Sequence, residues 1–255
     1  MCSFKFMVHR SSGGNNTKRL QTILARAGLS SRRGAVQFIE DGRVKVDGRT
    51  LTEKGARIDP DKHEIRVDGH PLSKEKKFYF LFNKPKNVIS TVRDTHGRKK
   101  VTDYFKVLKA RLYPVGRLDK DTTGILIITN DGALTHRLSH PGFEIEKEYE
   151  VKAEPGVRQS DILKIKRGIE LDGKMTAPCE IRRLGKSGGG AVYRIKLHEG
   201  RKRQIRRMFE MVGSRVTSLK RVKYGGLTLG RLKEGEFREL TSREIQRLKS
   251  LEPNS

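Results

Sequence analysis

The sequence predicts an α+β protein of two domains, a small one at residues 17–72 and a larger one at residues 78–245. Over the 255 residues, strand-like segments outnumber helical ones and do not alternate strictly with them, which argues against a doubly wound sheet. Residues 73–77 (SKEKK) hold no apolar side chain and predict a linker. Residues 1–16 end in SSGGNN and are expected to be a mobile leader, and residues 246–255 a short tail.

The small domain is expected to contain two helices and then two short strands. Apolar residues recur at helical spacing over residues 20–27 and 35–39, and a glycine follows each segment closely enough to end the helix. Residues 44–46 and 65–67 alternate between apolar and polar side chains, and each is followed by an Asp-Gly pair that favours a tight turn. The result is a compact helix-helix-strand unit.

The larger domain opens with an apolar run at residues 78–82 that predicts a buried strand. Pro85 ends it, because proline cannot continue a central ladder. A second buried strand is expected at residues 125–128, between a glycine and an Asn-Asp-Gly turn. Further strands are expected at 149–151, 181–183, 192–197 and 216–219, and helices at 133–139, 158–166, 203–212 and 242–251.

The charge balance indicates the class of partner. Fifty-six Lys and Arg against 30 Asp and Glu give a net charge of +26, which excludes binders of basic partners and favours a polyanion such as nucleic acid. Periodic apolar positions between the charges argue against a disordered basic tail. The chain has neither a membrane-length apolar run nor a signal-peptide core, and two cysteines, Cys2 and Cys179, cannot form a disulfide framework or a four-ligand zinc site. We expect a soluble cytosolic protein.

Two basic elements are candidate nucleic-acid contacts. Arg32 and Arg33 stand at the start of the second helix, where cations oppose the helix dipole and a bound phosphate would explain them. Residues 200–209 (GRKRQIRRMF) place five cations at the beginning of a helix whose apolar positions keep helical spacing. For both elements the alternative is a solvated surface with no ligand.

Three motifs that resemble known sites do not hold. Residues 185–187 (GKS) lack the earlier glycine of a phosphate loop. His136 and His140 have the spacing of a zinc helix but neither the following glutamate nor an evident third ligand. Asp119 and Asp121 form a DxD pair, but neighbouring cations make a divalent ion less favourable there. We expect no metal site.

Asp119 is nevertheless the leading candidate for a catalytic group. It lies in a polar loop, residues 116–124 (GRLDKDTTG), that leads directly into the buried strand at 125–128 and so has a rigid support. Arg117 and Lys120 would keep its carboxylate ionised. A carboxylate repels nucleic acid, so its presence at a binding surface needs a functional reason. The alternative is an aspartate that caps a turn.

Residues 116–132 (GRLDKDTTGILIITNDG) resemble the signature of RNA pseudouridine synthases, specifically those of the RsuA/RluB type that modify ribosomal RNA. Further blocks similar to this family follow the family's order: LFNKP at 81–85, KEYEV at 147–151 and EGRKRQIRRM at 199–208. Residues 20–48 resemble the RNA-binding module named for the fourth small-subunit ribosomal protein. Overall similarity favours the RluB-like branch.

The resemblance implies a mainly antiparallel mixed-sheet catalytic domain that isomerises uridine to pseudouridine in ribosomal RNA, with large-subunit RNA as the expected substrate. Asp119 matches the catalytic aspartate, Tyr149 the tyrosine beside the flipped uracil, and Arg206 the basic partner of that aspartate. The reaction adds no group and changes no oxidation state, so no cofactor is expected. Expected RNA contacts are Arg32, Arg33, Lys84, Arg117, Lys120, Arg201, Lys202 and Arg203.

Other readings remain open from the sequence. Asn87 stands where the family commonly has glycine, and asparagine tolerates a left-handed backbone better than most residues. Asp119 could attack the anomeric carbon or remove a ribose proton. Two alternative functions remain. One is a non-catalytic ribosome assembly factor, and the other is a metal-dependent nuclease or glycosyl hydrolase that uses Asp119 and Asp121. We expect a monomer that acts on ribosomal RNA or a ribosomal precursor particle, without a membrane.

Overall fold

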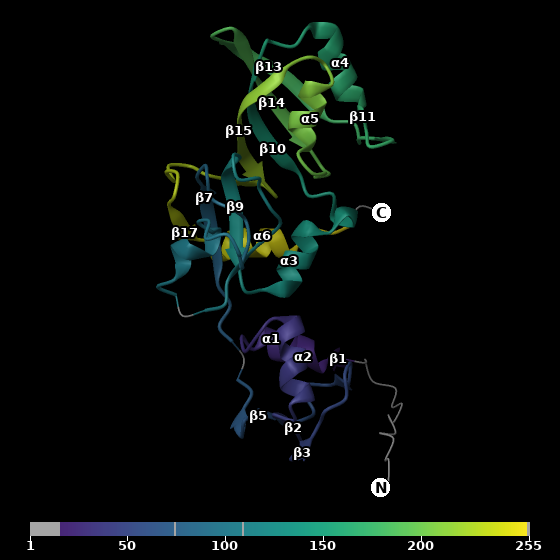
Figure 1. The fold of residues 1–255 in the computed structure, drawn as a ribbon, viewed down its shortest axis with the longest axis vertical. Helices are drawn as coiled ribbons and strands as arrows, with labels where there is room; N and C mark the ends of the chain where they lie inside the picture. The colour runs from purple at the N-terminus through teal and green to yellow at the C-terminus, as the bar shows by residue number, and fades with distance from the viewer. Residues whose placement is uncertain (1–15, 74, 109, 254–255) are drawn as a thin grey trace. The chain divides into compact units, whose positions relative to one another are not determined.

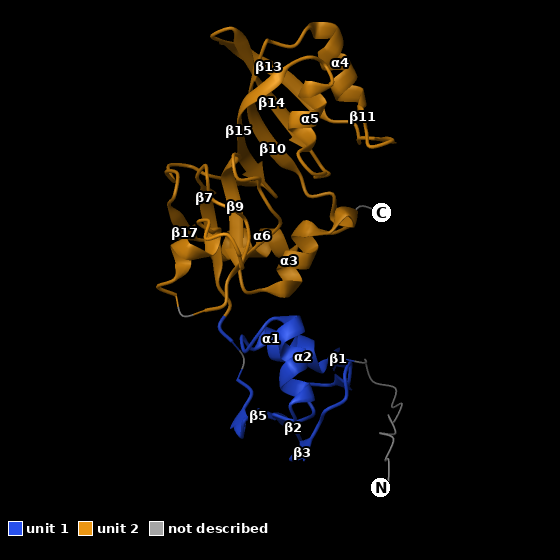
Figure 2. Ribbon diagram, in the orientation of Figure 1, with its two compact units in different colours: residues 1–76 blue, residues 77–255 orange. Residues whose placement is uncertain are grey.

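A computed structural model describes residues 16–73, 75–108 and 110–253. The chain divides into two compact units, residues 1–76 and 77–255 (Figures 1 and 2). The division falls inside the segment expected to be a linker. Apart from residue 16, the expected leader lies outside the described residues. No helix in the described parts of the chain is long and apolar enough to cross a membrane.

Unit 1 packs two helices against short strands, as its apolar pattern predicts. Ser31 caps the second helix by accepting a hydrogen bond from the Gly34 amide at 2.9 Å, and Leu20, Leu24 and Ile39 are buried in the core. The elements are α1 (Leu20–Arg26), α2 (Arg32–Glu40), β1 (Lys18–Arg19), β2 (Val44–Val46), β3 (Arg49–Thr50), β4 (Arg57–Ile58), β5 (Ile65–Val67) and β6 (His70–Pro71). Strands β3-β2-β5-β6 form one antiparallel sheet, and β1 pairs with β4.

Unit 2 is built on a nine-stranded sheet. Its strands are β7 (Tyr79–Lys84), β8 (Tyr113–Pro114), β9 (Thr123–Thr129), β10 (Lys147–Glu154), β13 (Glu180–Ser187), β14 (Gly190–Leu197), β15 (Arg215–Tyr224), β16 (Leu227–Thr228) and β17 (Phe237–Glu239). A separate hairpin joins β11 (Glu170–Leu171) to β12 (Lys174–Met175). The helices are α3 (Gly132–Ser139), α4 (Gln159–Arg167), α5 (Gln204–Glu210) and α6 (Ser242–Lys249), with 3-10 turns η1 (Val101–Phe105) and η2 (Pro141–Phe143).

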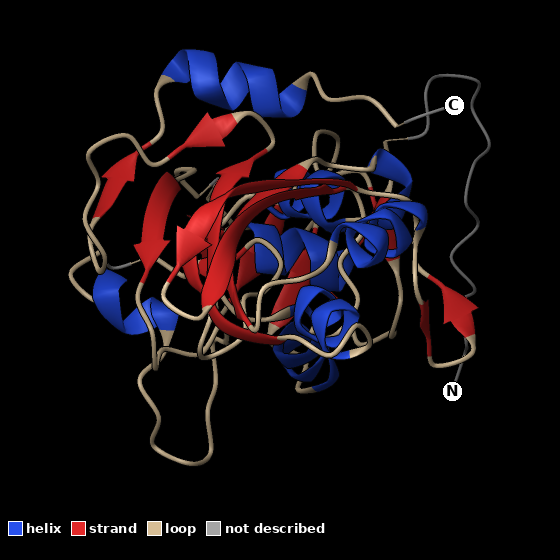
Figure 3. Cartoon of the chain, turned by 90° about the horizontal axis from the view of Figure 1, so that it is seen from above, coloured by secondary structure: helices blue, strands red, loops and turns tan. Residues whose placement is uncertain are grey.

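The order β13-β14-β10-β15-β9-β7-β17 confirms an α+β fold with a mainly antiparallel mixed sheet. Among the described strands, the pairing of β15 with β9 is the parallel one. The long strands of this sheet are visible from above in Figure 3. At the parallel junction Gly124 has φ +103°, and a Cβ there would stand 2.1 Å from the Arg221 carbonyl oxygen. Glycine therefore permits the two halves of the sheet to join.

Two apolar cores lie on opposite faces of this sheet. Along β7, Phe80 and Phe82 enter one core with Tyr149, whereas Leu81 between them enters the other with Leu248. The strand alternation of side chains explains this division. Both faces of β7 and β9 are covered, which is why these strands read as continuous apolar runs.

Packing in unit 2 continues past residue 245, where we expected the domain to end. Helix α6 continues to Lys249, and Leu248 is fully buried in the second core, with Leu251 packed against it. Leu248 follows Ile245 by three residues, so both lie on the face of the helix that packs inward. Residues 246–251 are part of the packed unit rather than a tail.

Candidate active site

A pocket of about 580 Å³ in unit 2 brings several of the expected site residues together. Its lining includes Asp119 from the loop before β9 and Tyr149 from β10. Leu197, Ile205 and Leu219 add apolar wall from β14, α5 and β15. Of the two carboxylates in the lining, Glu199 pairs with Arg201, and Asp119 stands beside an aromatic ring and aliphatic side chains. This arrangement suits a flat, largely uncharged group such as a nucleobase.

The Asp119 loop is held from both sides of the catalytic candidate. The Ser90 hydroxyl donates to the Leu118 carbonyl at 2.9 Å and accepts from the Leu118 amide at 3.1 Å. The Thr122 amide donates to the Asp119 carbonyl at 3.1 Å, which closes a turn. Among the described residues, no side chain forms a hydrogen bond or ion pair with the half-buried Asp119 carboxylate. The backbone is fixed while the carboxylate remains available.

Lys84, which we expected to contact RNA, supports this loop from the protein interior. Its side chain is fully buried, and Nζ donates to the carbonyls of Pro85, Lys120 and Thr122 at 2.9, 3.3 and 2.8 Å. Burial lowers the pKa of Lys84 to about 8, although nearby Asp121 and Asp119 act in the opposite direction. The lysine is a positioning residue.

Asn87 supplies a further support. It has φ 64°, which confirms the left-handed backbone expected where the family commonly has glycine. Its amide donates to the Lys120 carbonyl at 2.8 Å. The loop that follows β7 is therefore hydrogen-bonded to the Asp119 loop, and the asparagine preserves that contact.

Arg206 is bound to Asp121, not to Asp119 as we expected. One guanidinium nitrogen lies 3.1 Å from the Asp121 carboxylate and 3.3 Å from its carbonyl, and the other donates to the Val216 carbonyl at 3.1 Å. The Arg206 side chain is only 7% exposed. Helix α5 turns this arginine inward together with Ile205, so it fastens the loop instead of neutralising the catalytic candidate.

The strand pairing beside Tyr149 is irregular. The pairing of β10 with β15 shifts register between Glu148 and Tyr149, where β15 has one extra residue, Val222, and such a bulge bends the strand that carries it. Tyr149 is 9% exposed, belongs to the first core and also lines the pocket. Tyr149 therefore packs in the core and also borders the pocket, and its contact with the flipped base stays a prediction.

The other expected RNA contacts differ in availability. Arg117, Lys120 and Lys202 are exposed. Arg201 is engaged by Glu199 at 3.2 Å and by the carbonyls of Lys174 and Met175, and Arg203 lies 4.0 Å from Asp121. All of these except Lys120 line the Asp119 pocket, and Lys120 lines an adjoining depression that also contains Asp119.

In unit 1, Arg32 and Arg33 are exposed at the start of α2, as their sequence positions suggest. Elsewhere, the rings of His136 and His140 stack with centroids 5.0 Å apart. Within the described residues, no group of three or more His, Cys, Asp or Glu side chains is arranged to hold a metal ion.

Sequence reasoning missed the roles of Ser90 and Thr122. Ser90 is buried 28 residues before the loop it fixes, and nothing in its neighbourhood distinguishes it from a serine in a turn. The Thr122 hydroxyl is buried without a hydrogen-bond partner beside Asp119. Its place in the loop motif was visible, but its orientation depends on tertiary structure.

Comparisons with known proteins agree with this geometry. Residues 78–211 match the RNA pseudouridylate synthase family and residues 18–63 the S4 domain. "Ribosomal large subunit pseudouridine synthase B" of Bacillus subtilis (strain 168) is 44% identical over 92% of this chain and 96% of its own. The Vibrio cholerae protein of the same name is 34% identical over 92% of this chain and 75% of its own.

A solved structure described as a pseudouridylate synthase superposes with a TM-score of 0.66 at 30% identity, covering 90% of this chain and 99% of that one. The family match covers the strands from β7 to β14, with the Asp119 loop and Tyr149, and the S4 match covers the helices and first strands of unit 1. The chain therefore belongs to the RNA pseudouridylate synthase family and is an isomerase that acts on RNA, with an S4 domain preceding its catalytic unit.

Proposed function

We propose that this enzyme converts uridine to pseudouridine at a defined position of large-subunit ribosomal RNA, with Asp119 as the catalytic carboxylate. The observation that carries the proposal is the Asp119 carboxylate, which has no ion pair among the described residues and is mounted on a fixed loop in a pocket that joins Tyr149 and aliphatic side chains to several cations. The names of the Bacillus subtilis and Vibrio cholerae relatives support the choice of RNA. We place the reaction in the cytoplasm, during ribosome biogenesis, and propose that the enzyme works as a monomer.

The chemistry requires only groups that this pocket supplies. The bond between ribose C1′ and uracil N1 breaks, the base turns, and C1′ bonds to C5; C5 loses its proton and N1 gains one. Asp119 either attacks C1′ or removes the C2′ proton to begin an elimination, and both routes need an ionised carboxylate. Atoms and electrons balance without an oxidant or reductant.

The pocket walls account for capture of the base. A uridine must leave its stack to reach Asp119, at a cost of a few kcal/mol, which is smaller in loops and junctions. Tyr149 offers a ring face to the flipped uracil, and Leu219 and Ile205 exclude water around it. Phosphate contacts from exposed Arg117 and Lys202 would offset the cost of flipping.

The test uses ribosomal RNA from a strain in which the gene is deleted. We expect the purified enzyme to restore pseudouridine at a single site or neighbouring sites of large-subunit RNA, with or without EDTA, and to leave the strand intact. Strand scission that requires a divalent metal would support the nuclease alternative. Tight RNA binding with no pseudouridine in either naked RNA or precursor particles would support the assembly-factor alternative and contradict the proposal.

A further inference from the structure

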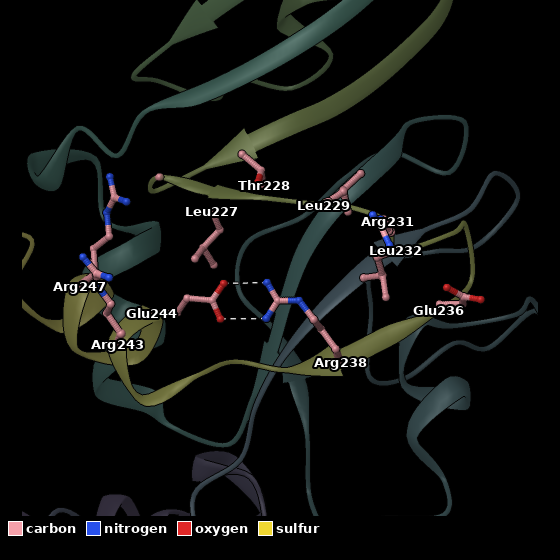
Figure 4. Close-up of a pocket in the computed structure, with 12 residues that line it drawn as sticks. Leu227, Thr228, Leu229, Arg231, Leu232, Glu236, Arg238, Arg243, Glu244 and Arg247 are labelled. Carbon is pink, nitrogen blue, oxygen red and sulfur yellow. Dashed lines mark hydrogen bonds and ion pairs between the residues drawn. The ribbon is translucent and has the colours of Figure 1, made fainter.

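Unit 2 contains a second cavity, of about 600 Å³, on the other face of the sheet (Figure 4). It is bordered by β16, β17 and α6, and Leu227 and Leu232 contribute from the second core. The Asp119 pocket is walled instead by the first core, through residues such as Leu197 and Leu219. The two cavities are separate sites.

The charges in this cavity are unbalanced. Four arginines line it, and Arg238 is neutralised by Glu244 through two hydrogen bonds of 2.8 and 2.7 Å (Figure 4). Arg231, Arg243 and Arg247 are exposed, and within the described residues they form no ion pair. The lining also includes Glu236, so four arginines face two carboxylates, and three guanidinium groups have no ion-pair partner in the described part of the chain.

The arginines are held near one another by the fold. Arg243 and Arg247 stand one turn apart on α6, where like charges at this spacing disfavour a helix by a few tenths of a kcal/mol. Thr241 and Glu244 fix the start of α6 with a capping box. The Arg247 guanidinium lies against Gly226, where a Cβ would be 2.5 Å from its Cζ. A bound anion would offset the repulsion between the two cations.

We propose that this cavity binds a phosphate-bearing segment of the RNA substrate, distinct from the nucleotide at Asp119. All four cations that line it are arginines, whose planar donors suit phosphate oxygens in a bidentate arrangement. Leu229 and Leu232, both partly exposed, offer apolar surface to a ribose or base beside that phosphate. The choice of RNA rests on the enzyme's substrate class, and the identity of that RNA rests on the proposed function.

The test is the double variant Arg243→Gln/Arg247→Gln, with binding to a full-length large-subunit ribosomal RNA transcript measured over a range of salt. We expect about tenfold weaker binding, which corresponds to about 1.4 kcal/mol, and a salt slope flatter by about 1–2. The pseudouridylation rate at saturating RNA stays unchanged, because neither residue lines the Asp119 pocket. Ultraviolet crosslinking of wild type should attach RNA to residues 226–232 or 242–249.

The matched control is Arg167→Gln/Arg215→Gln, which removes two exposed cations from outside both cavities. An equal loss of affinity in both double variants would overturn the proposal, since net charge alone would explain it. Unchanged RNA binding in the first variant would also overturn the proposal. So would adenosine monophosphate that binds in this cavity without changing the affinity of the enzyme for RNA. If wild type formed no pseudouridine but the first variant still lost RNA affinity, the proposed function would fail while this site stood.

Discussion

Lys84 and Arg206 show how buried cations serve a carboxylate that neither of them contacts. Lys84 holds the carbonyls on both sides of Asp121, and Arg206 holds the Asp121 carboxylate. Asp119, two residues earlier, is left without an ion pair among the described side chains. The two cations fix the backbone of the loop and leave the carboxylate that we propose to be catalytic without an ion pair to either of them.

Lys84→Met should therefore reduce kcat about 10- to 100-fold, because a shift of the loop by about 1 Å misplaces the carboxylate. KM should change little, since the Lys84 side chain is fully buried. Single-turnover kinetics on ribosomal RNA measure both, with circular dichroism as the check on folding. A larger effect on KM than on kcat would place Lys84 in RNA binding after all.

The same residue predicts a pH dependence. Because the folded-state pKa of Lys84 is about 8, its charge and one of its three donors are lost as pH rises through 8, and kcat should fall there. An unfolded lysine keeps its proton to a pKa near ~10.4. Between these values the unfolded chain binds more protons, so this group alone makes stability rise with pH. We expect kcat, measured between pH 7 and 9, to fall while the free energy of unfolding does not. A flat kcat profile over this range would contradict the role given to the Lys84 charge.

At the residue scale, the sequence predicted which residues lie at the candidate site more reliably than it predicted the contacts that each of them makes. The loop motif identified Asp119, and the pocket brings it beside Tyr149. The resemblance paired Arg206 with Asp119, whereas the structure pairs it with Asp121, because a pattern places a cation near a loop but does not say which oxygen its side chain reaches. That choice depends on how α5 and β7 pack around the loop.

At the scale of elements, the junction of β9 and β15 connects the fold to the site. The two strands meet in parallel at Thr123 and Gly124, only a few residues after Asp119. Any side chain at Gly124 would meet the backbone of Arg221. The direction from which the loop enters the sheet depends on this close approach.

Gly124→Ala should destabilise the protein by at least about 3 kcal/mol, since overpacking against backbone adds to an unfavourable φ. Gly116→Ala is the matched control: its φ is +68° and no atom lies within 4 Å of the added Cβ, so its cost is only about 1–2 kcal/mol. Urea unfolding of both variants gives the comparison. Equal losses of stability would show that backbone conformation, not the strand junction, requires the glycine.

Long elements were predictable because each buries a periodic set of apolar residues. The helices at 20–26 and 132–139 and the strands at 44–46 and 123–129 lie within a few residues of their expected positions. Two-residue strands such as β16 were missed, since so short a segment has no period to detect. The parallel pairing of β9 with β15 could not be predicted either, because strand order depends on contacts between residues that are distant in sequence.

At the scale of the whole molecule, the net charge of +26 favours RNA binding, but only part of that charge is available to phosphates. Each unit carries exposed cations of its own: Arg32 and Arg33 in the S4 domain, and Arg117 with the cations around α5 in the catalytic unit. Several other arginines are already neutralised, as Arg207 is by Asp172 at 2.7 Å. Total charge therefore overstates the number of phosphate contacts.

Arg32→Glu/Arg33→Glu should weaken RNA binding and flatten its salt dependence by about 1–2 in log–log slope, with thermal unfolding unchanged because both side chains are exposed. Lys45→Glu/Arg49→Glu, also exposed in unit 1, controls for charge reversal as such. Filter binding across salt concentrations measures the slopes. If the Arg32/Arg33 variant and the wild type had the same salt slope, these arginines would not contact RNA phosphates.

The central claim is that one carboxylate performs the reaction. Its most direct test is a strain lacking the gene, complemented with wild type or with Asp119→Asn, in which pseudouridine is mapped across all ribosomal RNA. We predict that deletion removes pseudouridine from large-subunit RNA, that wild type restores it, and that Asp119→Asn, expressed and folded to the same level, does not. Restoration of the modification by Asp119→Asn would contradict the account.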